Sequence, residues 1–226
     1  MKNVKVEDII DQYNRPAIFQ SELVALMHNE IPKGSKIIEI GSELGVVSLL
    51  LSDQFETTLL DLNPLAIALT QKAHQALNKQ ADFMVADMFQ MPIRDKHFDA
   101  VFNAGVIEHF NQEERTRALI EYKRILKDDG VMIIAFPNHY SLPYRLAYQI
   151  RTFLKKWPYP NEFKLYDLRQ EIEASGLILE RRTTLSKKSL MNWLSFVPPL
   201  KWIFQGIDKF YDFEGYLTVL MIRKKM

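Results

Sequence analysis

Between residues 36 and 136, short apolar segments alternate with longer segments whose apolar residues recur every three or four positions. The short segments are rich in Val, Ile, Leu and Phe, as buried strands are, and the longer ones have the spacing of helices packed on a sheet. The predicted strands are residues 36–40, 57–61, 81–86, 98–103 and 131–136. The predicted helices are residues 44–53, 65–77 (beginning at Pro64) and 112–126.

This alternation is typical of a parallel sheet covered by helices on both faces. Because such crossovers are right-handed, we predict a doubly wound α/β sheet, with its ligand crevice at the carboxyl ends of the strands. Lys127 to Gly130 is interpreted as a turn in which the glycine adopts left-handed backbone angles. Further on, the predicted elements are a helix at 167–175 and strands at 177–184 and 215–223.

Two irregular stretches interrupt the second half of the chain, at residues 138–165 and 186–212. Both are rich in Trp, Tyr, Phe and Pro, and the regular alternation of strands and helices stops there. We interpret them as aromatic-rich insertions after the fifth and sixth strands of the sheet.

Composition narrows the class of protein. A chain of 226 residues suits one domain, or one domain with a sizeable insertion. A net charge of +1 provides no general attraction to nucleic acid. The absence of cysteine excludes disulfides and thiolate zinc sites, and no histidine pair has metal-ligand spacing, so no metal is expected. Residues 1–11 are charged, and no run approaches the roughly 20 apolar residues of a membrane span, so we expect a cytoplasmic protein.

Glycines and acidic residues stand where the predicted strands end. Gly41 allows a tight turn, and Gly45 allows the next helix to approach closely. Asp61 closes the second strand, 20 residues after Gly41, where a carboxylate can accept hydrogen bonds from ribose hydroxyls. Asp87 and Met88 follow the third strand and suit an adenine ring. The Asp87 carboxylate can accept a hydrogen bond from the exocyclic amine of adenine, and the apolar Met88 side chain can pack against the face of the ring. A lone strand-end carboxylate is more often a solvated turn residue, so the prediction depends on the ordered set.

The segments EIGSELG, LLDLNP, VADM, FDAVFNAGVIEH and ILKDDGVMIIAFPN resemble class I S-adenosylmethionine-dependent methyltransferases of the small-molecule branch, over about residues 35–138. The resemblance implies a Rossmann-like, mostly parallel sheet of seven strands with an antiparallel last strand, and S-adenosyl-L-methionine as cofactor. The implied organisation is a single methyltransferase domain over 1–226, with an N-terminal helical cap at 1–34, a cofactor-binding core at 35–137 and substrate-side insertions at 138–165 and 186–212.

The same resemblance implies ten cofactor-binding residues. Those expected at the methionine part are Glu39, Gly41, Ser42, Gly45, Asn103 and Ala104. Those expected at the ribose and the adenine are Asp61, Leu62, Asp87 and Met88.

One position departs from the family, because Glu43 stands where the family usually has glycine. Its carboxylate could repel or crowd the carboxylate of the cofactor, meet its ammonium group, or turn outward. The flanking glycines, Gly41 and Gly45, favour the outward orientation.

The implied reaction is an in-line displacement, in which an acceptor oxygen, nitrogen or carbon takes the methyl group from sulfur. A general base is needed only where the acceptor does not lose its proton easily. His109 follows the fourth strand and is the candidate base, although it equally suits capping or packing of the next helix. Glu108 is interpreted as a helix-start acid.

The acceptor side is expected to be apolar. Its candidate residues are Tyr13, His139, Tyr140 and Tyr144, and Tyr13 suits packing of an N-terminal helix as well as a lid. The aromatic insertions favour a bulky or apolar small-molecule substrate over nucleic acid. Residues 190–206 could instead contact a membrane surface, form a homodimer face, or pack on the sheet.

Two other functions compete with methyl transfer. A nicotinamide-dependent oxidoreductase requires Gly-x-Gly-x-x-Gly, but after Gly41 the second and third glycine positions hold Glu43 and Val46. A carboxylate at the middle position also weakens the binding of a diphosphate more than the binding of a zwitterionic methionine. The other alternative is a binding or scaffold protein that kept the fold without turnover.

Overall fold

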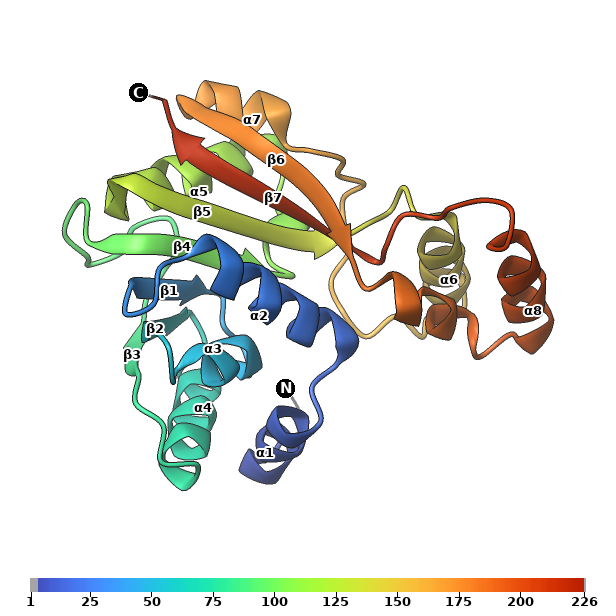
Figure 1. Ribbon diagram of the computed structural model, residues 1–226, viewed down its shortest axis with the longest axis horizontal. Helices are drawn as coiled ribbons and strands as arrows, with labels where there is room; N and C mark the ends of the chain where they lie inside the picture. The colour runs from blue at the N-terminus through green and yellow to red at the C-terminus, as the bar shows by residue number, and fades with distance from the viewer. Residues whose placement is uncertain (1–3, 226) are drawn as a thin grey trace.

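A seven-stranded sheet runs through the computed structural model in the order β3-β2-β1-β4-β5-β7-β6 (Figure 1). The structure describes residues 4–225, so residues 1–3 of the predicted cap and residue 226 lie outside it. The strands are β1 (Lys36–Ile40), β2 (Glu56–Asp61), β3 (Asp82–Val85), β4 (Phe98–Ala104), β5 (Leu126–Pro137), β6 (Leu177–Leu185) and β7 (Leu217–Lys224). The helices are α1 (Val6–Asn14), α2 (Ile18–Glu30), α3 (Val46–Leu51), α4 (Pro64–Ala76), α5 (Gln112–Ile125), α6 (Leu142–Phe153), α7 (Arg169–Ala174) and α8 (Pro198–Ile207), with short 3₁₀ helices η1 (Ile107–His109) and η2 (Lys187–Leu194).

The predicted fold class is confirmed. Strands β1 to β5 pair in parallel, whereas β7 runs antiparallel to both β5 and β6. The predicted strand at 36–40 coincides with β1, and the other predicted strands and helices within 36–126 match observed elements to within about two residues at most ends. The first helix is shorter than expected, since α3 covers only Val46–Leu51.

The predicted turn at residues 127–130 is wrong. Strand β5 already begins at Leu126, and the pairing with β4 shifts register between Phe98 and Ala100. Gly130 is buried, and a Cβ at this position would lie 2.8 Å from the Asp99 carbonyl oxygen. Glycine is therefore required here for close approach of two backbones, not for left-handed backbone angles.

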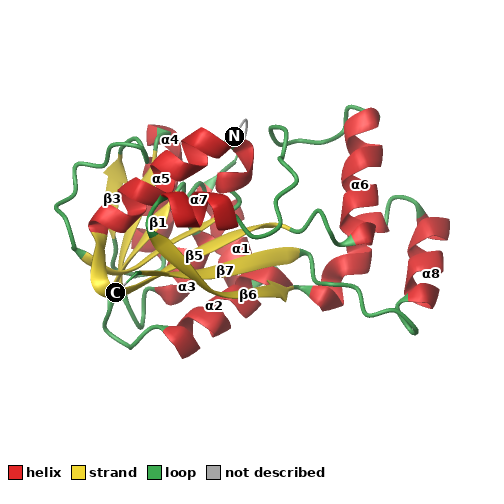
Figure 2. Ribbon diagram, turned by 90° about the horizontal axis from the view of Figure 1, so that it is seen from above, coloured by secondary structure: helices red, strands yellow, loops and turns green. Residues whose placement is uncertain are grey.

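Helices cover both faces of the sheet (Figure 2). Helices α5 and α7 lie over one face, and α2 and α3 lie over the other. Along β1, Ile38 and Ile40 contact the α5 side, whereas Ile37 contacts the α2 side, and all three are fully buried. This burial on both sides explains why the strands are apolar almost without interruption.

The two aromatic-rich insertions form a lobe beyond the carboxyl end of β5 (Figure 1). We define the lobe as residues 142–161 and 186–213, which include α6, η2 and α8. Its own small core contains Tyr144, Ala147, Leu190, Leu194, Phe204 and Phe213. Among residues 4–225, no helix is both long and apolar enough to cross a bilayer.

Candidate functional site

The loop after β1 is shaped by two glycines with left-handed backbone angles. Gly41 has φ +70° and Gly45 has φ +59°. A Cβ on Gly41 would lie 2.6 Å from the Val106 side chain, and a Cβ on Gly45 would collide with Leu59 and Thr70. Glycine at both positions therefore lets the β1 loop lie directly against the end of β4 and against β2.

Asp61 links this loop to the end of β2. Its Oδ2 accepts a hydrogen bond from the Glu43 N–H at 2.8 Å, and its Oδ1 accepts one from the Asn63 N–H at 2.8 Å. The carboxylate is thus fixed in place while remaining partly exposed. The next residue, Leu62, leaves 70% of its surface open to solvent, which gives an apolar face beside the carboxylate.

Glu39 and Ser42 are both buried at the end of β1. The Glu39 carboxylate accepts the Ser48 N–H at 3.3 Å, and burial raises the pKa of Glu39 to about 7. The negative charge of Asp61 acts in the same direction. The Ser42 hydroxyl is buried with no hydrogen-bond partner in the described chain, so it is available to a ligand.

The ends of β3 and β4 meet at the Tyr122 hydroxyl. The Asn103 Nδ2 donates to this oxygen at 3.2 Å, and the hydroxyl donates to the Met88 sulfur at 3.4 Å. Met88 is buried, whereas Asp87 beside it is exposed and accepts the Phe89 N–H at 2.9 Å. The Asn103 Oδ1 is buried and has no partner within the described residues, while Ala104 closes β4 partly exposed.

The end of the first aromatic-rich insertion lies against the residues that follow β4 and β5. We call residues 157–166 the strap. The Phe163 N–H donates to the Glu108 carbonyl oxygen at 2.8 Å, and the Asn161 carbonyl oxygen accepts from His109 Nδ1 at 3.2 Å. Burial, together with the charges of Glu43 and Glu162, raises the pKa of Tyr159.

Glu108 is an acid at the start of a short helix, as predicted, and it is buried. It lies in η1 and is only 2% exposed, and one of its carboxylate oxygens lacks a partner in the described structure. Burial, reinforced by the nearby charge of Glu162, raises the pKa of Glu108 to about 8. Its other oxygen lies 3.9 Å from His109 Nε2. The EH pair in the sequence was a signal for this group, but its burial was not visible there.

The geometry of His109 specifies its neutral tautomer. A carbonyl oxygen can only accept, so the contact with Asn161 requires the hydrogen on Nδ1. The free lone pair then lies on Nε2, which faces Glu108. Nε2 is therefore the ring atom of His109 that can accept a proton.

The substrate-side candidates do not lie together on an open surface. His139 and Tyr144 are buried, and both donate to the Glu162 carboxylate at 2.8 Å. Tyr140 is half exposed, with its ring 5.0 Å from that of Tyr166 in the strap. His139 and Tyr144 thus hold the strap down, and only Tyr140 is open to a ligand.

Tyr13 adopts the packing role that the sequence allowed as the alternative to a lid. Its ring lies 5.8 Å from the Lys79 ammonium, and Lys79 forms an ion pair with Asp53. Lys79 follows the end of α4 and Asp53 follows α3, so both stand at the edge of the sheet opposite the crevice. Tyr13 packs there with α3 and α4 because it continues the apolar face of α1.

The charges at the four strand ends favour a cationic ligand. Residues 39–46, 61–65, 85–89 and 102–109 contain five acidic residues and no Lys or Arg. A diphosphate would meet no Lys or Arg there and would face the carboxylates of Glu43, Asp61 and Asp87, whereas a sulfonium with an ammonium group would be attracted. The unpartnered Asn103 Oδ1 and Ser42 Oγ and the space left by the two glycines also fit such a group. In the described chain, no three His, Asp or Glu residues are placed to hold a metal ion.

Residues 38–134 match the family described as "Methyltransferase domain". Residues 38–134 therefore belong to a methyltransferase domain. The sheet order and the antiparallel β7 agree with the fold of class I S-adenosylmethionine-dependent methyltransferases. S-adenosylmethionine is the cofactor of such methyltransferases.

The methyltransferase domain has curated relatives and structural neighbours. It is 42% identical over 60 residues to mouse "Probable tRNA methyltransferase 9B", covering 26% of this chain but 13% of that protein. It is 22% identical over 208 residues to 2-methyl-6-phytyl-1,4-hydroquinone methyltransferase of Synechocystis, covering 85% of this chain and 64% of that protein. Magnesium protoporphyrin IX methyltransferase from Synechocystis, solved with bound SAH, shares the fold, with a TM-score of 0.65 at 17% identity, 100% of this chain and 90% of that one being covered.

Proposed function

We propose that this protein transfers a methyl group from S-adenosylmethionine to a bulky, apolar small molecule. The observation that carries the proposal is the set of strand ends, which combine two required glycines, an anchored Asp61 carboxylate and five acidic residues without a cation. That set suits a positively charged nucleoside and disfavours a diphosphate.

Each part of the site would have its own task in binding. Asp61 would accept hydrogen bonds from the ribose hydroxyls, and Leu62 would pack beside the adenine. The Asn103 Oδ1 and Glu39 carboxylate would face the ammonium end. S-adenosylmethionine, when bound, supplies a methyl group already activated by its sulfonium sulfur. The chain then has to position the acceptor and exclude water, a task that the strap is placed to perform.

His109 would act as the proton acceptor for the incoming substrate. Its tautomer leaves the lone pair on Nε2, and Glu108 lies beside that atom. We expect His109→Gln to lower kcat about 100-fold or more while leaving the dissociation constant of the cofactor unchanged. An unchanged kcat would remove His109 from the reaction.

An apolar acceptor is supported by the surroundings of the crevice. A hollow of about 440 Å³ lies between the start of α2 and the lobe, with Ile18, Phe19, Trp193 and Tyr216 among its walls. The Tyr216 carbonyl oxygen accepts from the Asn138 N–H at 2.7 Å, so the hollow adjoins the carboxyl end of β5. The Synechocystis relative is named for a phytyl-substituted hydroquinone, which is an acceptor of this kind.

Calorimetry with three ligands tests the first half of the proposal. We expect S-adenosylmethionine and S-adenosylhomocysteine to bind and NAD not to bind. Asp61→Ala should weaken binding by about 10- to 100-fold, because a charge-assisted hydrogen bond contributes about 1.5–3 kcal/mol. Asp53→Ala removes a carboxylate at the opposite edge and should have no effect. Failure of both adenosyl ligands to bind would overturn the proposal and leave a scaffold protein.

Formation of S-adenosylhomocysteine in the presence of acceptors tests the second half. A hydroquinone bearing an isoprenoid chain should be methylated, and the same hydroquinone without the chain should react far more slowly. Equal rates, or transfer only to nucleic acid, would contradict an apolar acceptor pocket.

A further inference from the structure

The outer surface of the lobe is unusually rich in exposed apolar side chains. Phe210 and Phe153 are 94% and 87% exposed, the two highest values among the large apolar residues of the described chain. Trp202 is 68% exposed. The other large apolar residues exposed on the lobe are Leu142, Leu154, Tyr159, Phe196, Ile203, Ile207 and Tyr211. A contiguous surface of this composition requires a partner more often than isolated apolar residues do.

Helix α8 presents these residues on one side. Phe204 points inward and is 7% exposed, packing against Phe213 at 5.7 Å between ring centroids. Trp202, Ile203 and Ile207 are exposed on the helix, and Phe210 continues the same surface just beyond it. The inner face of α8 therefore packs in the lobe core. Its outer face is also apolar and is exposed.

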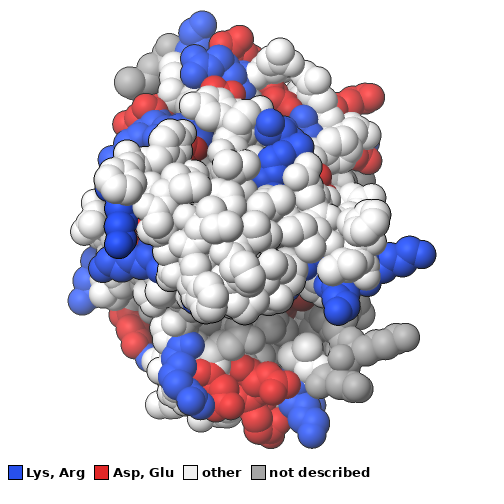
Figure 3. All heavy atoms as spheres, turned by 90° about the vertical axis from the view of Figure 1, so that its right-hand side faces the viewer, with Lys and Arg blue, Asp and Glu red and all other residues white. Residues whose placement is uncertain are grey.

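The lobe is also strongly basic. Its two segments, residues 142–161 and 186–213, contain eight Lys or Arg residues, two Asp and no Glu. Because the whole chain has a net charge of only +1, the remainder is net negative. Figure 3 looks directly onto this end of the molecule and shows a broad uncharged surface with Lys and Arg side chains at its margins. The Arg151 guanidinium lies 4.6 Å from the Phe196 ring centroid, so basic and aromatic residues are interleaved.

We infer that the lobe docks the protein on the surface of a bilayer that contains anionic lipids. Exposed aromatic side chains would enter the boundary between headgroups and acyl chains, and the marginal cations would meet the lipid phosphates. A second copy of this chain fits less well, because two equally basic faces would repel each other. The lobe extends from the crevice end of β5, so docking would turn the mouth of the site toward the membrane. The inference does not depend on whether methyl transfer occurs.

Vesicle co-sedimentation of the full chain tests the charge requirement. We expect binding to vesicles of phosphatidylcholine with about one third phosphatidylglycerol, and little binding to phosphatidylcholine alone. Lys156→Glu with Lys209→Glu should weaken binding at least about tenfold, and raised salt should act in the same direction. Lys33→Glu with Lys72→Glu makes the same change of net charge on exposed residues outside the lobe and should leave binding within about twofold.

A second pair of variants tests the apolar requirement. Phe153→Ser with Phe210→Ser should weaken binding at least about tenfold. Ile120→Ser with Ile178→Ser alters residues that are 50% and 46% exposed elsewhere and should not. Trp fluorescence should shift to shorter wavelength on docking, and Trp202→Phe should remove most of that shift while binding persists. Circular dichroism of each variant verifies that it is folded.

Three results would overturn the inference. The first is the absence of binding to anionic vesicles by the folded protein. The second is binding that neither lobe pair reduces. The third is a concentration-dependent dimer in sedimentation velocity that Phe153→Ser with Phe210→Ser abolishes, in a protein that does not bind vesicles, which would make this face a homodimer interface.

Discussion

At the residue scale, burial controls the protonation of two carboxyl groups at the strand ends. The pKa of Glu39 is raised to about 7 and that of Glu108 to about 8, from an ordinary value of 4.5. Between pH 4.5 and the raised pKa, the folded chain retains a proton that the unfolded chain has lost. The free energy of unfolding therefore falls as pH rises through this range, by up to about 1.4 kcal/mol per pH unit for each group.

Glu108→Gln should remove one of these two contributions, since an amide does not ionise. We expect the stability of the variant relative to the parent to rise between pH 5 and pH 8.5 by on the order of 3 kcal/mol, measured by urea unfolding at several pH values. Glu113→Gln, an exposed change in the first turn of α5, should give a curve parallel to that of the parent. Parallel curves for the parent and Glu108→Gln would show that Glu108 is ionised in the folded protein.

Glu43 is one of six described non-glycine residues with left-handed backbone angles, and it lies in the β1 loop. It has φ +44°, an angle that glycine adopts without strain and that costs other residues about 1 kcal/mol. Its side chain is exposed and its charge acts on Tyr159 in the strap. We therefore expect Glu43→Gly to be more stable than Glu43→Ala by about 1 kcal/mol in urea unfolding.

The same two variants also test the orientation of Glu43. Both should bind S-adenosylmethionine within about threefold of the parent, because an outward carboxylate neither attracts nor repels the ligand strongly. Binding tightened tenfold or more in Glu43→Gly and Glu43→Ala would show that the carboxylate repels the cofactor.

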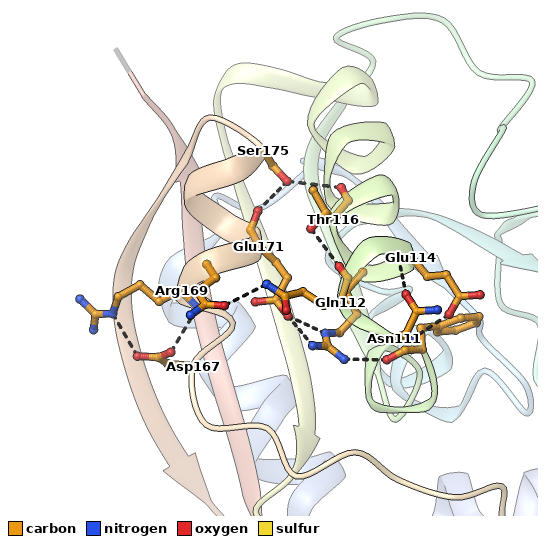
Figure 4. A network of polar contacts seen from close by, with 11 residues as sticks. Asn111, Gln112, Glu114, Thr116, Asp167, Arg169, Glu171 and Ser175 are labelled. Atoms are coloured by element: carbon orange, nitrogen blue, oxygen red, sulfur yellow. Dashed lines mark hydrogen bonds and ion pairs between the residues drawn. The ribbon is translucent and has the colours of Figure 1, made fainter.

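At the element scale, a buried ion pair joins α5 to α7, within the polar network that Figure 4 shows. The Arg115 Nε donates to Glu171 Oε1 at 2.8 Å, and the two side chains are 9% and 6% exposed. Arg115 Nη1 also donates to the Phe110 carbonyl oxygen at 2.6 Å, one residue after His109. The pair therefore fixes the segment that presents His109 as well as the packing of two helices.

Glu171→Ala should leave the Arg115 guanidinium buried and unpaired. We expect a loss of about 3–5 kcal/mol in the free energy of unfolding, measured with urea. Glu56→Ala removes the exposed Lys36–Glu56 pair and should cost under about 1 kcal/mol. A loss below 1 kcal/mol for Glu171→Ala would mean that water reaches the guanidinium.

The sequence predicts well those strands and helices whose spacing of apolar residues follows from a single kind of burial. Strand β1 is buried on both sides, and α5 has a single apolar face, so both are readable from spacing alone. Gly130 suggests a turn where β5 in fact begins. Glycine is required at this position because the backbone of the neighbouring strand β4 lies too close for a side chain. Aromatic composition marks residues 138–165 as an insertion, but the strap has no period and its anchor Glu162 contacts His139, 23 residues away. Its position against the strand ends is therefore not predictable from local spacing.

At the scale of the whole molecule, the candidate site exists only in the folded chain. The β1 loop, the end of β2, the end of β4 and the strap come from four separate regions, and the Asp61 and Glu108 contacts hold them together. The unfolded chain has no comparable set of groups. A ligand of this site should therefore stabilise the protein by mass action alone.

S-adenosylhomocysteine at about 100 times its dissociation constant should stabilise the folded protein by about 2.7 kcal/mol. For a chain of this size the midpoint of thermal unfolding should rise by about 5–10 °C, because 1 kcal/mol corresponds to about 2–4 °C. NAD at the same concentration should leave the midpoint unchanged, since the strand ends present no cation to a diphosphate. Asp61→Ala should lose most of the shift, and Asp53→Ala should keep it. Equal shifts with both ligands would mean that adenosine recognition alone, and not the cationic end of the cofactor, determines what this fold binds.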